Sequence, residues 1–382
     1  MRILHLMLSC FYIDDGNYQE NILPLLNKED GHDVKIIAST ETFVQNNLLG
    51  YTEPRSYTTK DGIPIVRLPY KASIGGNFFS RKIRKYKDLY EQIKDFSPDI
   101  IFFHGSAAHA ILTAAKYKKK HPNVKLFADS HEDYNNSARN FISKNVLHRH
   151  FYKRYLKKAL PYIDKVFYIT KETKNFLSEF YKVPDSKLDF LPLGGLISDE
   201  KVRSDVRKKV RKQLGLSNND ILCVHSGKMD KFKKTADIVN AFTRVPDSRL
   251  RLIIIGSMDT DVKAAVEAGI NADKRIEYLG WKTKGELLSY LYAGDLYIQP
   301  GGQSVTMQNA LCAGCTAALY PYESHKFLLG DNVFYIENEA DIENLLVRIV
   351  SDNSTLKNMK ERSFTLAKNV LDYKKIVKKM YE

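Results

Sequence analysis

LDFLPLGGLISDE, residues 188–200, interrupts a regular alternation of strand-like and helix-like segments. Pro192, Gly194 and Gly195 within it are residue types that end regular secondary structure. On both sides of this stretch, short apolar runs of strand length alternate with helical patterns. Such alternation predicts parallel sheets that are covered by helices on both faces. The stretch therefore predicts the junction of two doubly wound, Rossmann-like α/β domains.

The two series of segments share one architecture. Strand-like runs occupy residues 2–9, 33–39, 63–70, 99–105, 125–131 and 165–170 in the first series, and 221–227, 251–257, 276–281 and 295–301 in the second. We expect an N-terminal domain at 1–194, a C-terminal domain at 195–364, and a helix at 365–382 that crosses back to the N-terminal domain. Because open parallel sheets bind ligands at the carboxyl ends of their strands, two sheets facing each other are expected to form a cleft.

The composition is that of a globular protein. Of 382 residues, 43% are hydrophobic and 27% are charged, which argues against a mainly disordered chain. No apolar stretch approaches the roughly 20 residues that span a bilayer, and the N-terminus has no signal-peptide pattern. We expect a cytoplasmic protein, with peripheral attachment to the inner face of the cell membrane as an open alternative.

The net charge of +14 indicates anionic partners. Basic residues are mixed with aromatic ones at residues 78–90, 116–122 and 148–160. Such runs are typical of a surface that lies against anionic lipid headgroups, and they are equally compatible with solvated helix faces. Binding of nucleic acid is not expected, because the sequence contains no recognised nucleic-acid module.

Cys312 and Cys315 form a CxxC pattern, which raises the question of metal or redox chemistry. No second Cys or His pair in the sequence completes a four-ligand zinc site. The pattern lies at the end of an apolar helix, so buried packing is the favoured interpretation. We expect no metal in this protein.

HSGKMDKFKKT, residues 225–235, leads from a strand into a helix. Gly227 permits a tight turn, and Lys228 and Lys233 follow it five residues apart. A helix N-terminus favours anions, and two ammonium groups beside it would hold a diphosphate without a metal. An exposed lysine-rich loop is the alternative interpretation.

PGGQSVTMQNAL, residues 300–311, is a second transition from strand to helix. Gly302 lets the backbone approach a ligand closely, and Ser304, Val305 and Thr306 lie where the helix is expected to begin. Their N–H groups would point towards phosphate oxygens, although an ordinary turn before a Ser-capped helix has the same pattern. Two such sites in one half of the chain favour a nucleotide diphosphate as the ligand.

Taken in order, these segments resemble the retaining glycosyltransferases of family 4, which have the GT-B fold. The resemblance rests on DDGNYQENILP with GHDVKIIAS, KVFYITKETKNFL with LDFLPLGG, SGKMDKFKKTADIVNAF, LRLIIIGS, RIEYLGW, and LYAGDLYIQPG with NALCAG. These motifs cover nearly the whole chain in the expected order, although each motif alone has low specificity.

The resemblance implies roles for individual residues. Gly16 corresponds to the glycine-rich first loop, which approaches the donor phosphates or the acceptor. Lys228 and Lys233 correspond to the cations that neutralise the diphosphate leaving group, and the backbone at Gly280 and Trp281 corresponds to the contact with the nucleobase. The other donor contacts that it implies are Gly227, Gly302, Gln303, Ser304, Val305, Thr306, Gln308 and Asn309.

His131 corresponds to a histidine near the transferring sugar. Asp129, Glu132 and Asp133 make its surroundings polar, and we expect it to orient hydroxyl groups rather than to act as a base. A hydrogen-bonded strand-end histidine without a catalytic role is the alternative. His104 is expected to be structural.

The helix after residue 303 lacks the acids of the family. Members carry two glutamates eight positions apart, and NALCAG places Asn309 at the second position, or Gln308 by the pattern of a related subset. An amide still accepts hydrogen bonds from ribose, but less strongly than a carboxylate does, so weaker donor binding is expected. Gln303 or Ser304 is a candidate substitute for the first glutamate.

The expected function is a metal-independent retaining transfer of a hexosyl or similar sugar from a UDP- or GDP-sugar. The resemblance implies a lipid-linked saccharide acceptor, as in the assembly of bacterial surface polysaccharides. A catalytically silent GT-B protein that binds a sugar nucleotide or a partner enzyme is the main alternative. A sugar-nucleotide epimerase and an inverting transferase are further alternatives.

Overall fold

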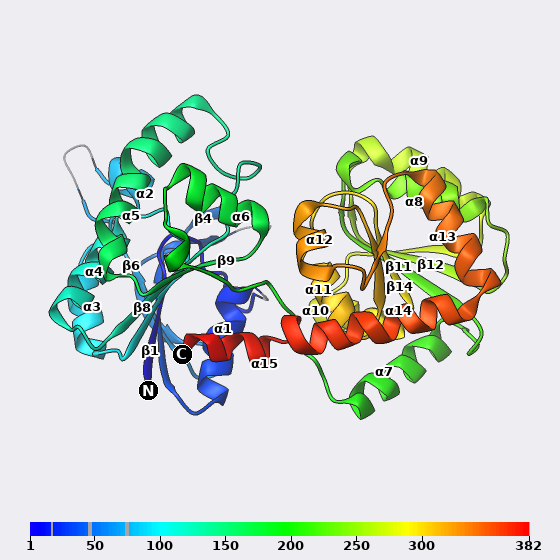
Figure 1. The fold of residues 1–382 in the computed structure, drawn as a ribbon, viewed down its shortest axis with the longest axis horizontal. Helices are drawn as coiled ribbons and strands as arrows, with labels where there is room; N and C mark the ends of the chain where they lie inside the picture. The colour runs from blue at the N-terminus through cyan, green and yellow to red at the C-terminus, as the bar shows by residue number, and fades with distance from the viewer. Residues whose placement is uncertain (17, 45–47, 73–75, 382) are drawn as a thin grey trace. The chain divides into compact units, whose positions relative to one another are not determined.

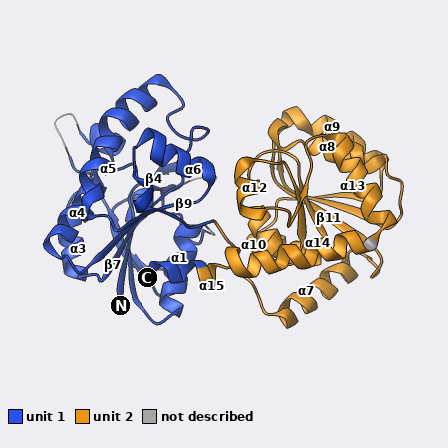
Figure 2. Ribbon diagram, in the orientation of Figure 1, with its two compact units in different colours: residues 1–192, 376–382 blue, residues 193–375 orange. Residues whose placement is uncertain are grey.

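The computed structural model describes residues 1–16, 18–44, 48–72 and 76–381 of the chain, which is coloured from its N-terminus to its C-terminus in Figure 1. The chain forms two compact α/β units (Figure 2). Unit 1 comprises residues 1–192 and 376–382, and unit 2 comprises residues 193–375. The expected division after residue 194 lies two residues beyond this boundary.

Unit 1 contains an eight-stranded sheet with the order β10-β9-β8-β7-β1-β2-β6-β5. All pairings are parallel except that of β5 with β6 at one edge. The central strands are apolar and almost wholly buried, as the predicted covering of both faces requires. The strands are β1 (Arg2–Met7), β2 (Asp33–Ser39), β5 (Arg55–Thr58), β6 (Pro64–Leu68), β7 (Ile100–Phe103), β8 (Lys125–Ser130), β9 (Lys165–Tyr168) and β10 (Leu188–Phe190), and β3 (Glu41–Phe43) and β4 (Leu49–Tyr51) form a separate antiparallel pair.

The helices of unit 1 follow the strands and bury their apolar faces on the sheet. A large core lies under α3, α4, α5 and η3, and a smaller one is formed by side chains of β1, β2 and β6. The helices are α1 (Gln19–Glu29), α2 (Phe78–Ile83), α3 (Leu89–Phe96), α4 (Ala110–Lys120), η1 (Ile142–Tyr152), α5 (Lys153–Ala159), η2 (Leu160–Tyr162), α6 (Lys171–Asn175), η3 (Phe176–Phe180), η4 (Asp185–Lys187) and η7 (Val377–Met380).

Unit 2 contains a six-stranded parallel sheet with the order β13-β12-β11-β14-β15-β16. One core lies between the sheet and α8, α9 and α13, and the other lies beneath α7, α10 and α11. The strands are β11 (Ile221–Met229), β12 (Leu250–Met258), β13 (Ile276–Gly280), β14 (Leu296–Gln299), β15 (Thr316–Leu319) and β16 (Phe334–Tyr335). The helices are α7 (Glu200–Gln213), η5 (Lys231–Lys233), α8 (Thr235–Thr243), α9 (Thr260–Ala272), α10 (Lys284–Ala293), α11 (Thr306–Cys312), α12 (Glu323–Leu329), α13 (Glu339–Ser351), α14 (Asn353–Leu366) and η6 (Ala367–Leu371).

The end of the chain divides between the units. Of the segment 365–382, only residues 376–382 belong to unit 1. Ala367 and Leu371 are wholly buried in the core of unit 2, which holds the earlier part of the segment there. The short helix α15 (Tyr373–Ile376) spans the boundary. None of the helices in the described ranges has the length and apolar character needed to cross a bilayer.

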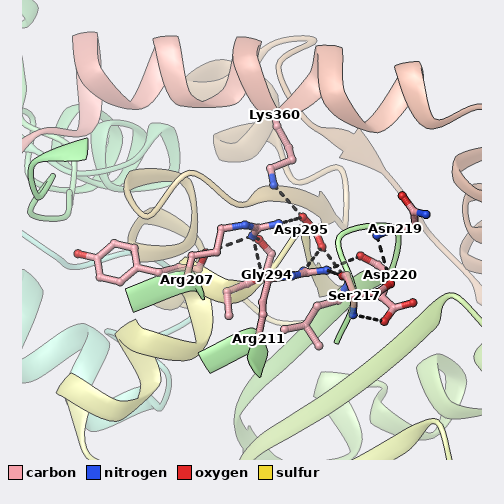
Figure 3. Close-up of polar contacts among 11 residues, drawn as sticks. Arg207, Arg211, Ser217, Asn219, Asp220, Gly294, Asp295 and Lys360 are labelled. Carbon is pink, nitrogen blue, oxygen red and sulfur yellow. Dashed lines mark hydrogen bonds and ion pairs between the residues drawn. The ribbon is translucent and has the colours of Figure 1, made fainter. Parts of the chain in front are cut away.

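A buried carboxylate joins two helices of unit 2 to its sheet (Figure 3). Asp295, directly before β14, accepts hydrogen bonds from Arg207 of α7 at 2.6 Å and from Lys360 of α14 at 2.9 Å through Oδ1. Its Oδ2 accepts from Arg211 and from the backbone N–H of Leu222, both at 2.9 Å. Although burial favours the neutral acid, Lys360 and Arg207 hold the pKa of Asp295 well below its usual range.

Replacing Asp295 with alanine is expected to lower the free energy of unfolding by about 3–5 kcal/mol, because three cations lose their shared counter-charge. Urea unfolding at pH 7, followed by circular dichroism, measures this loss. Glu267→Ala removes only an exposed pair with Lys263 and is the control, with a loss of at most about 0.5 kcal/mol. Equal losses in the two variants would contradict the role of Asp295 as the shared counter-charge of the three cations.

Candidate functional site

Two glycines lie side by side where β11 and β12 approach their carboxyl ends. Gly227 and Gly256 are paired in the parallel ladder, and both have positive φ values, of 134° and 141°. A β-carbon placed on Gly256 would lie 1.8 Å from the carbonyl oxygen of Gly227. Only glycine permits this approach. At the first predicted anion site, the carboxyl ends of β11 and β12 therefore present backbone atoms that no side chain covers.

Lys233 brings the two predicted anion-binding motifs together. A β-carbon on Gly227 would lie 3.6 Å from its Cε, and one on Gly302 would lie 3.5 Å from its Nζ. The lysine side chain thus lies against the α-carbons of both glycines. Burial lowers the pKa of Lys233, and the nearby Asp230 partly offsets this effect. A partly dehydrated ammonium group beside bare backbone is a favourable place for a phosphate.

Local hydrogen bonds fix the position of Lys233. Asp230 accepts from the backbone N–H groups of Phe232 and Lys233 and so caps η5. Gly301 packs on this turn, because a β-carbon there would lie only 2.1 Å from the carbonyl oxygen of Phe232. Direct contact between the two motifs therefore depends on a glycine at position 301.

His225 is a structural residue of this site that the sequence did not reveal. Its Nδ1 donates to the carbonyl of Ile298 at 2.8 Å, and its Nε2 lies 3.0 Å from the Thr235 hydroxyl, which donates to it. Burial lowers the pKa of His225 to about 4, so the ring is neutral. It connects the end of β14 to the first residue of α8, on the two sides of the Lys233 turn.

Side chains of the second motif hold its own turn. Gln299 donates to the carbonyl of Gly302, and Gln303 donates to the Ser324 hydroxyl at 2.8 Å. Ser304 Oγ lies 3.2 Å from the hydroxyl of Thr306, the first residue of α11. Val305 is exposed beside them. The Gln303 side chain is therefore hydrogen-bonded to the second residue of α12, which follows Glu323 in the sequence.

The two amides on α11 have different surroundings. The Gln308 amide group donates to the carbonyls of Val305 at 3.0 Å and Ser304 at 3.2 Å. The side-chain oxygen of Gln308 therefore lies on the side of the amide that faces away from these two carbonyls. The oxygen of Asn309 faces the backbone of Gly195, since a β-carbon there would lie 3.1 Å away from it. Gln308 is thus the better placed of the two amides to accept a bond from a ligand.

Lys228 and Trp281 are exposed on the same unit. The ammonium group of Lys228 lies 3.5 Å from Asp259, and its side chain is 68% exposed. Gly280 ends β13 with a φ of 66°, and the Trp281 side chain that follows is 74% exposed. In the sheet order β13 lies two strands from β11, so Gly280 and Gly227 lie at the same sheet edge.

The cysteines of the CxxC pattern are free thiols in the core beneath α11. Burial raises the pKa of Cys312 and of Cys315 to about 12. Within the part of the chain that the structure describes, no three His, Cys, Asp or Glu side chains are arranged to hold a metal ion.

In unit 1, a buried arginine fixes the loop that contains Gly16. Arg67 is 1% exposed and donates to the carbonyl of Tyr12 and to Asp14, both at 3.0 Å. A β-carbon on Gly16 would lie 2.6 Å from Oδ1 of Asn21 and 2.9 Å from the carbonyl oxygen of Ile13. Glycine is therefore required at position 16 for the loop to close on the start of α1.

His131 lies beside a buried carboxylate at the carboxyl end of β8. Its Nε2 is 3.7 Å from Oδ2 of Asp129, and His104 Nδ1 is 3.4 Å from the same oxygen. The other oxygen of Asp129 accepts from the backbone N–H of Gly105 at 2.6 Å. Burial opposes the charge on His131, but Asp129, Glu20 and Glu132 raise its pKa to about 9. His131 is therefore an imidazolium at neutral pH.

A second buried carboxyl group adjoins His131. Glu132 accepts hydrogen bonds from the hydroxyls of Ser106 and Tyr181, both at 3.2 Å. Burial raises its pKa, and Arg84 opposes this rise. Arg84 itself donates to Ser9 and to the carbonyl of Ala107, both at 3.0 Å. These residues come from distant parts of the sequence, and no local spacing indicates that they meet.

Comparison with known proteins bears on the fold of the chain. The sequence model of Glycosyltransferase Family 4 matches residues 21–194. No curated protein sequence matches the chain. Among solved structures, a glycosyltransferase from Rickettsia africae has a TM-score of 0.68 at 15% identity, with 99% of this chain and 96% of that chain covered.

Two further structures cover the whole of this chain. HepE from Anabaena, in complex with UDP, has a TM-score of 0.66 at 13% identity over 98% of its length. The sucrose-phosphate synthase from Thermosynechococcus elongatus has a TM-score of 0.65 at 12% identity over 97% of its length. Residues 21–194 are therefore similar to Glycosyltransferase Family 4, and the chain as a whole has the GT-B fold.

Proposed function

We propose that the protein is a retaining glycosyltransferase that moves a sugar from a nucleotide diphosphate sugar to a hydroxyl group. The observation that carries this proposal is the Lys233 ammonium group held against Gly227 and Gly302. HepE, a structural relative, has been solved with UDP and with UDP-glucose, which favours a UDP-sugar as the first donor to test.

Lys233 is proposed to neutralise the diphosphate as it leaves. Charge develops on the leaving oxygens in the transition state, so a fixed cation there lowers the barrier directly. Lys228 is exposed and would move from Asp259 to a phosphate oxygen when the donor binds. This arrangement supplies the positive charge from the chain itself, which is why the proposal includes no metal.

His131 is proposed to orient hydroxyl groups of the transferring sugar or the acceptor. An imidazolium donates from both ring nitrogens and accepts from neither, so it cannot serve as the base. The acceptor hydroxyl would lose its proton to a phosphate oxygen of the donor on the face from which the diphosphate leaves. Gly16 belongs to the loop that would approach the same reactants.

Gln308 is proposed to replace the carboxylate that binds ribose. Its oxygen accepts a neutral hydrogen bond where relatives make a charge-assisted one, at a cost of about 1–3 kcal/mol in donor affinity. Gly280 and Trp281 would contact the nucleobase through their backbone. The loss of both acids also favours one rival function, a catalytically silent protein that binds a sugar nucleotide without transferring the sugar.

A patch on unit 1 supports a lipid-linked acceptor at an anionic membrane surface. Phe78 of α2 is 70% exposed and Phe141, next to η1, is 78% exposed. Lys82 lies 5.6 Å from the ring centroid of Phe78, and α2 packs against η1 through Phe79 and Phe151. Exposed aromatic side chains with lysine beside them suit insertion among acidic headgroups. We define this apolar–basic patch by Phe78, Phe79, Lys82, Phe141, Ile142, Lys144 and Arg149.

Thermal unfolding with UDP-, GDP- and CMP-sugars tests donor binding, because a ligand of the folded state raises the unfolding temperature. One nucleotide class is expected to raise it in the wild type. Lys233→Met should weaken affinity for that donor by about 10- to 100-fold, since it removes a hydrogen-bonded charge. Lys231→Met, an exposed lysine of the same turn, is the control and should not change affinity.

Transfer to an acceptor, with the product anomer read by NMR, separates catalysis from silent binding. Binding of a sugar nucleotide without any turnover would favour the alternative function, a catalytically silent binding protein. An inverted product anomer would exclude the retaining mechanism, and absence of any binding would contradict the proposal as a whole.

Activity is expected to fall as pH rises through about 9, because His131 then loses the proton with which it donates. The His131→Gln variant should lack this alkaline limb in its profile of kcat/KM against pH. The raised pKa also stabilises the fold below the unfolded value of about 6.5, and this contribution is lost as pH rises through the folded value. Thermal unfolding at each pH therefore accompanies the assay, and an alkaline limb that persists in the variant would contradict the assignment.

The apolar–basic patch is expected to bind vesicles that contain phosphatidylglycerol more tightly than neutral ones. Phe78→Ser with Phe141→Ser should weaken this partitioning by at least about tenfold, because two aromatic rings no longer insert. Val347→Ser, an exposed apolar residue of α13, is the matched control in a sedimentation assay. Equal vesicle binding by the wild type, the double variant and the control would show that the patch does not contact the membrane.

A further inference from the structure

Arg84, at the end of α2, is held at one nitrogen of its guanidinium group and open at the other two. Its Nη1 donates to the hydroxyl of Ser9 and to the carbonyl of Ala107, both at 3.0 Å. Among the residues that the structure describes, none accepts a hydrogen bond from Nε or Nη2, and neither atom is enclosed in the interior. A guanidinium group has five N–H donors, so three of them have no acceptor in the described chain.

Glu132, directly after His131, is open on one side in the same way. Its Oε2 accepts hydrogen bonds from the hydroxyls of Ser106 and Tyr181, both at 3.2 Å. Within the described ranges no group donates to its Oε1, which is not enclosed either. Each oxygen of a carboxylate can accept about two hydrogen bonds. The Oε1 atom can therefore accept a hydrogen bond from a ligand.

These two open groups lie at the carboxyl edge of the sheet of unit 1. The adjacent strands β1, β7 and β8 lead to Ser9, Ser106 and Glu132. Arg84 and Glu132 are anchored on the consecutive residues 107 and 106, whose α-carbons are about 3.8 Å apart. Each of the two groups affects the pKa of the other. Open parallel sheets bind ligands at this edge, and one sugar ring is large enough to reach both groups.

Arg84 and Glu132 do not satisfy each other. An arginine beside a carboxylate commonly forms a short bidentate pair, but each of these side chains binds its own uncharged partners instead. The backbone of Arg84 has a φ of 57°, which is uncommon for a residue with a side chain, and its carbonyl accepts from the N–H of Ala110 at 3.2 Å. Donors on one side and an acceptor on the other remain for a ligand. A hydroxyl group can bond to both, because it donates and accepts.

The charges around this pair favour a ligand without a negative charge. Burial opposes the charge of Arg84, but Glu132 and Glu41 are among the groups that raise its pKa. Carboxylates also surround His131, the residue before Glu132. A phosphate or carboxylate on the ligand would be repelled by these acids. The hydroxyl groups of a neutral sugar would bind both members of the pair without this repulsion.

We propose that Arg84 and Glu132 are specificity-determining residues that together bind hydroxyl groups of a neutral sugar, which is the terminal sugar of the acceptor. Arg84 donates to a sugar oxygen, and Glu132 accepts from the same or a neighbouring hydroxyl. Calling this sugar the acceptor rests on the proposed transferase function, but the binding of the sugar does not.

The first test is the binding of methyl glycosides to the full-length protein without nucleotide, measured by NMR titration. Glucoside, galactoside and mannoside are each compared with the uronate in which the hydroxymethyl group is a carboxylate. At least one neutral glycoside is expected to bind, and its uronate should bind at least about tenfold more weakly because it faces like charges. Failure of all three neutral glycosides to bind, or equal affinity within each pair, would overturn the proposal.

Arg84→Lys tests the donor side. The lysine keeps the charge but loses the planar group that donates in several directions, so affinity for the neutral glycoside should fall by about tenfold. Arg154→Lys changes an exposed arginine of α5 in the same way and should leave the affinity unchanged. A lower unfolding temperature of Arg84→Lys with unchanged affinity would mean that Arg84 only links Ser9 to Ala107, and the proposal would fail.

Glu132→Gln tests the acceptor side. The amide keeps an oxygen that accepts hydrogen bonds but removes the negative charge, so the difference between the neutral glycoside and its uronate should shrink to about threefold or less. Glu179→Gln is the matched control, because the Glu179 carboxylate also accepts from a tyrosine hydroxyl, that of Tyr134 at 3.4 Å. A preference for the neutral glycoside that is unchanged in Glu132→Gln, or equally reduced in Glu179→Gln, would contradict the role of Glu132.

A transfer assay separates this inference from the proposed function. If the neutral glycoside binds but no sugar nucleotide supports transfer to it or to any other acceptor, the proposed function fails and the sugar site remains. If transfer occurs with equal kcat/KM to a neutral glycoside and to its uronate, the proposed function stands and the inference about Arg84 and Glu132 is wrong.

Discussion

The confinement of one lysine side chain against two glycines is the constraint on which the proposed chemistry depends. Lys233 lies against Gly227 at the end of β11 and Gly302 after β14. A side chain at either glycine would occupy space beside the ammonium group, and one at Gly301 would separate the two motifs. Small residues, the turn capped by Asp230 and the neutral His225 together hold the Lys233 ammonium group in this position.

The sequence predicted the buried strands well because their signal is local. Residues 33–39 were expected as a strand and form β2, and residues 221–227 begin β11. Central strands of a covered parallel sheet are apolar throughout, so few other structures fit them. The edge strands β5, β10 and β16 were missed, because strands of four, three and two residues are too short to show a hydrophobic pattern.

The candidate site was predictable only in part. Glycines and lysines near strand ends can be read from spacing, and the structure brings Lys233 together with Gly227 and Gly302. Glu132 and Tyr181 could not be paired in advance, because a hydrogen bond between residues 49 positions apart leaves no pattern in either segment. The hydrogen bond between Asn27 and Tyr381 has the same property over a larger separation.

A crystal structure of the protein with UDP tests the central claim most directly. The account predicts a diphosphate oxygen within about 3 Å of the Lys233 ammonium group, the distance of a charge-assisted hydrogen bond, with Gly302 beside it. A diphosphate bound away from Gly227, Lys233 and Gly302 would contradict the account.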